Sequence, residues 1–168
     1  MSHIDLGRPA DAILAPNRNG QAWLAGLGRA LELAGARTVV VPAAGAQGHA
    51  LARTCDALVL AGDAAAVDAL RMQEGARHLA RAMDAQGKPI GVIGHGAWLL
   101  VSAGLAAGRE LASWPSLQDD IRNAGGTWVD REVVVDANWV SSRGPEDLWV
   151  FSRELLAAIA RAAGPVPA

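Results

Sequence analysis

The residues around Gly94 have the spacing of a turn that holds a reactive side chain. An apolar run over 90–93 leads directly into Gly94-His95-Gly96, and a helix with apolar residues at helical spacing follows. A strand–turn–helix elbow of this kind projects one side chain above the end of a parallel sheet, in a strained backbone conformation. Enzymes place serine or cysteine at that position, whereas this chain has Gly94. The pattern therefore predicts a catalytic architecture without its usual nucleophile.

His95 is the side chain beside the elbow that could act as a general base, since a neutral imidazole accepts protons near neutral pH. Because no nucleophile adjoins it in the sequence, we favour a structural or interface role for it. Cys55, the only cysteine, precedes a strand and is expected to be packed, although its substitution for the nucleophile in space stays open. The serines outside any Gly-x-Ser-x-Gly setting are expected to form hydrogen bonds or caps: Ser102, Ser113, Ser116, Ser141 and Ser142.

Neither a metal nor a cofactor is expected. The remaining histidines, His3, His49 and His78, do not have the spacing of metal ligands. The glycines form neither Gly-x-Gly-x-x-Gly after a strand nor a Walker motif, so no nucleotide site is indicated.

The composition is that of a single globular domain over 1–168, with 51% hydrophobic and 19% charged residues. A formal net charge of −2, with arginines scattered among acids, predicts no nucleic-acid partner. No apolar run reaches the ~18–20 residues of a membrane helix, and the first residues do not resemble a signal peptide. We therefore expect no membrane partner and a cytoplasmic location.

Short apolar strands alternate with helical patterns along the chain, which favours a parallel sheet with right-handed crossovers. The stretch 42–53 is rich in Ala and Gly and is expected to be irregular. Strands are expected at 12–16, 38–41, 57–60, 90–93, 108–113, 132–136 and 140–142. Helices are expected at 20–34, 64–86 with a break near Gly75, 95–106, 116–123, and from 144–147 onward.

The second half of the chain resembles the ThiJ/PfpI superfamily, and its PfpI-type branch most. The segments that carry the resemblance are Asp56–Gly62, Gly87–Pro89, His95–Gly96, Leu99–Leu105, Gly108–Arg109, Asp119–Asp136 and Asn138–Arg143. The resemblance implies an α/β fold, a flavodoxin-like three-layer sandwich with a mostly parallel central sheet, akin to class I glutamine amidotransferases.

The resemblance also assigns positions at the site, two of which have lost their chemistry. The family's elbow cysteine falls on Gly94, and the glutamate that touches its thiol falls at or beside Gly20. No acid lies between Asp11 and Glu32, so a shift in the alignment cannot restore that glutamate. The loss of both groups implies a site that has drifted or been repurposed.

Other family positions keep polar or aromatic residues. The histidine after the elbow is His95, and a Gly-Gly pair that supplies oxyanion donors survives only as Gly62-Asp63. Asp68 stands where PfpI-type members place an acid that reaches a neighbouring subunit's histidine, which implies a homodimer or larger homo-oligomer. Trp114 stands where some relatives have a site histidine.

Six tryptophans are unusual beside one phenylalanine and no tyrosine. The rings of Trp98 and Trp114 are expected either to close the pocket above the elbow, where the family has its cysteine, or to form an apolar binding site. Trp128, Trp139 and Trp149 are expected in the core or at a subunit interface.

We therefore predict a pseudoenzyme that binds a small molecule or takes part in a stress response. Its expected ligand-binding residues are Gly62, Asp63, Gly94, His95, Trp98 and Trp114. One alternative is a hydrolase, glyoxalase-like enzyme or hydratase that acts on a small electrophile through His95 and water. Another is an oligomeric structural module.

Overall fold

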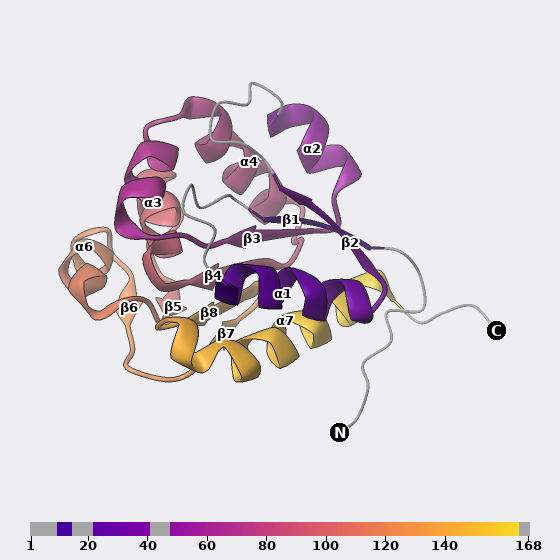
Figure 1. Ribbon diagram of the computed structural model, residues 1–168. Helices are drawn as coiled ribbons and strands as arrows, with labels where there is room; N and C mark the ends of the chain where they lie inside the picture. The colour runs from indigo at the N-terminus through magenta and orange to yellow at the C-terminus, as the bar shows by residue number, and fades with distance from the viewer. Residues whose placement is uncertain (1–9, 15–21, 41–47, 165–168) are drawn as a thin grey trace.

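The computed structural model describes residues 10–14, 22–40 and 48–164 (Figure 1). Its main sheet has the strand order β2-β1-β3-β4-β8-β7. All neighbouring pairs are parallel except β7 and β8, so the prediction of a mostly parallel sheet is confirmed. In that order the strands are β2 (Ala36–Val40), β1 (Ala10–Leu14), β3 (Ala57–Leu60), β4 (Ile90–Ile93), β8 (Trp139–Ser142) and β7 (Val134–Asp136).

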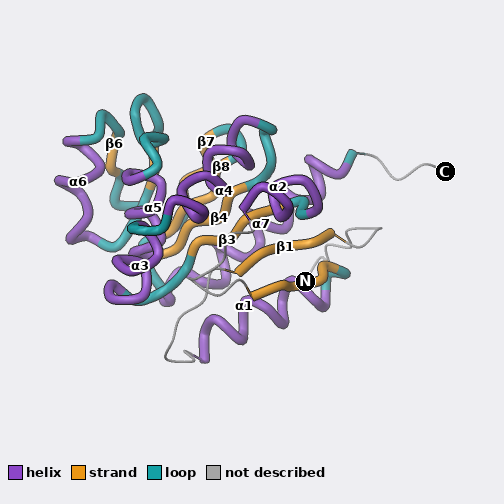
Figure 2. The backbone as a smooth tube through the Cα atoms, turned by 90° about the horizontal axis from the view of Figure 1, so that it is seen from above, coloured by secondary structure: helices purple, strands orange, loops and turns teal. Residues whose placement is uncertain are grey.

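Helices cover both faces of this sheet, which makes three layers (Figures 1 and 2). One layer holds α1 (Ala22–Leu33) and α7 (Leu148–Ala163), and the other holds α2 (Gly48–Thr54), α3 (Ala64–Arg71), α4 (Glu74–Ala85) and α5 (Ala97–Ser102). The fold is thus a flavodoxin-like α/β sandwich, as expected.

The central strands are apolar on both faces because each face meets a helical layer. In β3, Leu58 and Leu60 pack into the core on the α4 and α5 side, whereas Val59 packs on the α1 and α7 side. All four residues of β3 and all four of β4 are buried. The expected ranges 57–60 and 90–93 are confirmed.

A smaller unit lies beyond the end of the main sheet. Strand β5 (Glu110–Leu111) pairs in parallel with β6 (Thr127–Trp128), and α6 (Gln118–Asn123) connects them. Short 3-10 turns precede three helices, at Gly94–Gly96, Pro115–Leu117 and Pro145–Asp147.

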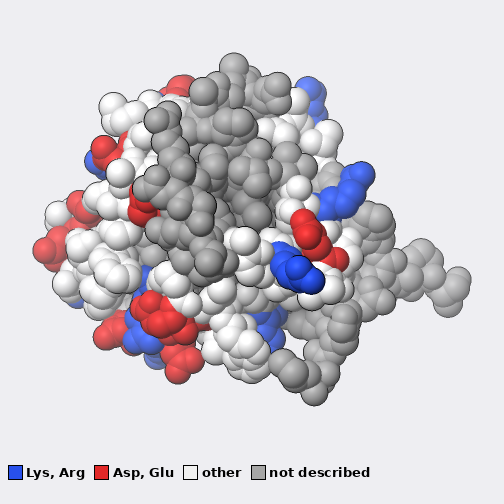
Figure 3. Space-filling model, in the orientation of Figure 1, with Lys and Arg blue, Asp and Glu red and all other residues white. Residues whose placement is uncertain are grey.

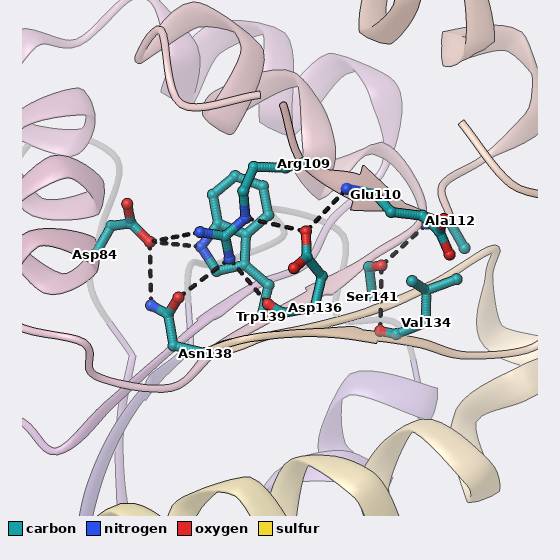
Figure 4. Close-up of polar contacts among 9 residues, drawn as sticks. All are labelled: Asp84, Arg109, Glu110, Ala112, Val134, Asp136, Asn138, Trp139 and Ser141. Carbon is teal, nitrogen blue, oxygen red and sulfur yellow. Dashed lines mark hydrogen bonds and ion pairs between the residues drawn. The ribbon is translucent and has the colours of Figure 1, made fainter. Parts of the chain in front are cut away.

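A polar network fixes the start of β8 (Figure 4). The carboxylate of Asp84 accepts hydrogen bonds from Trp139 Nε1 at 2.7 Å and from Asn138 Nδ2 at 3.0 Å. The guanidinium of Arg109 lies 4.0 Å from the Trp139 ring centroid and pairs with Asp136 at 3.2 Å. This network holds the β7–β8 hairpin on α4, so the other end of β8 is placed beside the elbow.

Several expected boundaries were wrong. Helix α2 occupies the second part of the stretch expected to be irregular, because Lys88 Nζ donates to the carbonyls of Ala52 and Cys55 at 2.7 Å each. The helical stretch expected over 64–86 has the expected break near Gly75: it is two helices, separated at Met72 and Gln73.

Shorter elements differ as well. The strand expected over 108–113 is only Glu110–Leu111, and its partner Thr127–Trp128 was not expected. Strands this short contain too few residues to show an alternating pattern.

On the face drawn in Figure 3, basic and acidic side chains lie next to one another over the described part of the chain. Along the helices, oppositely charged side chains form ion pairs, as Arg71 does with Asp68 and Arg77 with Glu74. Within the described residues, no helix combines the length and apolar character needed to span a membrane.

Candidate functional site

Gly94 lies at the turn after β4, in a conformation that favours glycine. Its φ is +61°, a region that residues with a Cβ enter at a cost. Among the described residues, a Cβ built on Gly94 would have only the Arg143 carbonyl oxygen within 4 Å, at 3.6 Å, which is ordinary van der Waals contact. The elbow therefore has the backbone conformation expected of a nucleophile position, and no described residue blocks the side chain that would project there.

Gly96 allows the elbow to approach β3 closely. A Cβ on this residue would collide with the backbone carbonyl of Leu60, the last residue of β3. The sequence analysis assigned no role to Gly96, although a glycine two residues after a turn is a signal for close backbone approach. This contact brings the elbow next to the residues that follow β3.

Gly62 and Asp63 form the turn from β3 into α3. Gly62 has φ +152°, and a Cβ there would lie 3.2 Å from Val67 Cγ2. Asp63 is the N-cap of α3, and its Oδ1 accepts a hydrogen bond from the Ala66 N–H at 2.8 Å. The turn therefore presents a carboxylate at the edge of the site.

Two tryptophan rings flank His95. The imidazole stacks on Trp114 with a centroid distance of 5.6 Å and an interplanar angle of 24°, and it lies 5.7 Å from the tilted ring of Trp98. Burial lowers the pKa of His95 below the ordinary value of 6.5, while the negative charge of Asp63 acts in the opposite direction. The ring is accordingly neutral at neutral pH.

Trp98 is held by groups on the outer side of His95. Its Nε1 donates to Asp120 Oδ2 at 2.7 Å, and the guanidinium of Arg71 lies 4.7 Å from its ring centroid. Trp98 is not among the described residues that line the cavity described next, and its ring lies against His95, so its place in a ligand site stays a prediction.

A cavity of about 370 Å³ opens above the elbow. It lies at the carboxyl ends of the parallel strands, where open α/β sheets bind their ligands. Of the expected ligand-binding residues, all but Trp98 line it, whereas Gly20 lies outside the described residues. The lining residues are Gly62, Asp63, Ile93, Gly94, His95, Trp114, Pro145 and Glu146.

Pro145 and Glu146 were expected only as the start of a helix. They form the 3-10 turn before α7, and their presence in the cavity depends on β8 lying next to β4. Nothing in the local sequence indicates this neighbourhood, because strand order is a property of the whole sheet.

Arg143 stabilises the turn Pro145–Asp147 through an ion pair with Asp147. Its Nε and Nη2 donate to the two carboxylate oxygens of Asp147 at 2.8 and 2.9 Å, and its Nη1 donates to Asp130 at 3.0 Å. These carboxylates raise the pKa of Arg143, and the buried Asp147 ties the start of α7 to the end of β8. The guanidinium of Arg143 is therefore occupied by the carboxylates of Asp147 and Asp130.

The other candidate groups lie elsewhere. Cys55 is 2% exposed and precedes β3, at the opposite end of that strand from the elbow, so it cannot take the place of a nucleophile at Gly94. Asp68 is exposed and pairs with Arg71 at 2.9 Å. Among the described residues, no group of three or more His, Cys, Asp or Glu side chains is arranged to hold a metal ion.

A mostly parallel sheet between two helical layers, with a strand–turn–helix elbow under a cavity, defines a flavodoxin-like protein with an elbow site. The chain belongs to the DJ-1/PfpI family, whose model matches residues 9–158. The resemblance inferred from the sequence is confirmed.

Two relatives bear the name deglycase. The chain is 50% identical over 101 residues to a deglycase of Pyrococcus horikoshii, a match that spans 60% of each chain. It is 46% identical over 71 residues to protein/nucleic acid deglycase 2 of Escherichia coli, which spans 42% of this chain and 41% of the relative. These names are those of enzymes and do not support a non-catalytic family role.

The fold also resembles that of Drosophila melanogaster DJ-1beta. Its crystal structure matches 92% of this chain and 96% of its own length, with a TM-score of 0.78 and 21% sequence identity.

Proposed function

We propose that this chain binds a small organic molecule in the elbow cavity and performs no covalent catalysis there. The observation that carries the proposal is Gly94, which combines a positive φ with a place in the cavity lining that no described residue obstructs. The volume of about 370 Å³ lies within the range of small-molecule sites. Covalent catalysis requires a side chain that attacks the substrate, and a glycine supplies none.

The binding proposal is tested by NMR on isotope-labelled protein, with a set of small organic molecules added one at a time. Ligands in the cavity shift the backbone amide signals of Gly62 and Gly94 and the imidazole signals of His95. Shifts confined to other parts of the chain would contradict the proposal. Trp114→Ala serves as the matched variant, because it removes the ring that stacks on His95 and should weaken binding.

A second candidate is a deglycase-type hydrolysis in which water replaces the missing thiol. Two observations favour it: relatives carry that name, and a neutral His95 adjoins the open space at Gly94. In this scheme the imidazole takes a proton from a water molecule, and the carboxylate of Asp63 stabilises the resulting imidazolium. Turnover that is lost in His95→Ala would establish this second function.

A further inference from the structure

Among the described residues that line the elbow cavity, the two acidic side chains, Asp63 and Glu146, have no Lys or Arg beside them in the lining. We propose that the molecule bound there is a small cation of the substituted ammonium class, rather than a neutral or anionic compound. This inference rests on the proposed binding function and specifies its ligand. It is carried by two carboxylates, an aromatic wall, and the way in which the neighbouring arginines are engaged.

The Glu146 carboxylate is an uncompensated charge at the cavity. It folds back over Gly144, where a Cβ would lie 2.7 Å from its Oε2. Within the described part of the chain, no ion pair or hydrogen bond engages this carboxylate, although it lines the cavity. Glu146 is solvent-exposed, so what favours a cation beside it is the Coulomb attraction of its charge rather than a cost of burial.

Asp63 provides the second negative charge. Its Oδ1 caps α3, and the partial positive charge at a helix N-terminus equals only about half an elementary charge. The full charge of the capping carboxylate exceeds that partial charge, so the edge of the cavity at Asp63 remains negative. An anion that approaches the α3 N-terminus therefore meets a carboxylate already in place.

The nearest arginines do not offset these charges. Arg143 is held by Asp147 and Asp130, and Arg71 is held by Asp68 and by the outer Trp98 ring. The described residues that line the cavity include neither lysine nor arginine. Burial lowers the pKa of His95, so its imidazole adds no positive charge at neutral pH.

Trp114 supplies the aromatic surface that such a cation requires. Its ring is 40% exposed, stacks on His95 and lines the cavity. Cations with several C–H groups, such as quaternary ammonium ions, bind to the faces of aromatic rings while nearby carboxylates balance their charge. The combination of an indole ring with two carboxylates suits this class and disfavours carboxylate or phosphate ligands.

The test uses three probes of nearly equal size and shape: choline, the neutral 3,3-dimethylbutan-1-ol and the anionic 3,3-dimethylbutanoate. Isothermal titration calorimetry at neutral pH and low ionic strength gives the dissociation constant of each for the full chain. We expect choline to bind at least ~10-fold more tightly than the alcohol, and the anion to bind most weakly, since charge complementarity separates them.

Matched variants test whether the carboxylates of Asp63 and Glu146 cause the preference for choline. Glu146→Gln and Asp63→Asn each remove one charge, and asparagine still caps α3. Each should weaken choline binding several-fold and leave the affinity for the alcohol unchanged. Asp119→Asn removes the same charge from an exposed site on α6, where the side chain is 83% exposed, and should change neither affinity.

The outcomes separate the two proposals. If the alcohol binds as tightly as choline, the cavity is a small-molecule site and the inference about charge is wrong. If choline binds but neither cavity variant weakens it, the cation is recognised elsewhere and the inference is again wrong. If none of the three probes binds, the proposed binding function fails together with it.

Discussion

Two adjacent buried serines at the end of β8 differ in their hydrogen bonding. Ser141 Oγ accepts a hydrogen bond from the Ala112 N–H at 3.0 Å, whereas Ser142 Oγ has no partner among the described residues. A buried polar group without a partner costs about 1–3 kcal/mol, and the same cost arises when the partner of a buried N–H is removed.

We therefore expect opposite effects from the same substitution at these positions. Ser142→Ala should raise the free energy of unfolding by about 1 kcal/mol, and Ser141→Ala should lower it by about 1–2 kcal/mol, because only the latter strands a donor. Urea denaturation of both variants measures the difference. Equal losses of stability would mean that Ser142 has a partner after all.

At position 94 a larger side chain has room for its atoms, but the positive φ of the backbone disfavours any residue with a side chain. Gly94→Cys places Cβ in open space, yet φ of +61° costs a residue with a side chain about 1 kcal/mol. We expect a folded variant with lower stability and without recovered activity, because the glutamate that touches the family's elbow thiol has no counterpart between Asp11 and Glu32. Thermal denaturation and thiol titration check this, and a variant more stable than the parent would contradict the backbone argument.

His95 should make stability depend on pH. Its pKa is lowered in the folded protein, so below the ordinary value of 6.5 the unfolded chain binds a proton that the folded protein does not. Stability should therefore fall as the pH drops from 6.5 toward the folded pKa, and this loss should be smaller in His95→Gln. An imidazole NMR titration with a midpoint above 6.5 would reverse the sign and refute the prediction.

At the scale of elements, Lys88 stabilises helix α2, a segment whose own sequence does not predict a helix. The ammonium group donates to two carbonyls at the C-terminal end of α2, and this helix packs on α4. Lys88→Met should lower the free energy of unfolding by about 1–2 kcal/mol and speed hydrogen exchange in α2. The exposed Arg53→Met is the control, and equal exchange rates in both variants would contradict the role of Lys88.

The elements that were predicted correctly from the sequence are those whose local apolar pattern matches their burial in the fold. β3 and β4 were placed correctly because a run of four apolar residues buried on both faces has few alternatives. Helix α2 was missed because its stability depends on a lysine far along the chain. The break between α3 and α4 was expected near Gly75 and lies at Met72 and Gln73, where Arg77 donates to the Arg71 carbonyl, a contact that no propensity encodes.

The same distinction holds for the site. Gly94 and His95 were found from their adjacency at the end of a strand, and Gly62 and Asp63 from the matching turn of the family. Glu146 was not found, because it joins the cavity only through the position of β8 in the sheet.

At the scale of the whole molecule, a homo-oligomer remains our proposal. Phe151 and Leu155 in α7 are fully buried within the chain, so they cannot contact another copy. Trp149 is 62% exposed on the same helix and is the residue that still favours a contact between copies. Light scattering should give a mass of two or more chains, and Trp149→Ala should shift it toward one. A mass of one chain that is independent of concentration would exclude the oligomer.

In our proposal, the elbow cavity binds a small molecule and does not catalyse its conversion. The most direct measurement is steady-state turnover in a deglycase assay, with wild type and His95→Ala compared at equal concentration and neutral pH. We expect the two rates to be equal to each other and to the rate without protein. A wild-type rate clearly above that of His95→Ala would show that the cavity is catalytic and contradict the claim.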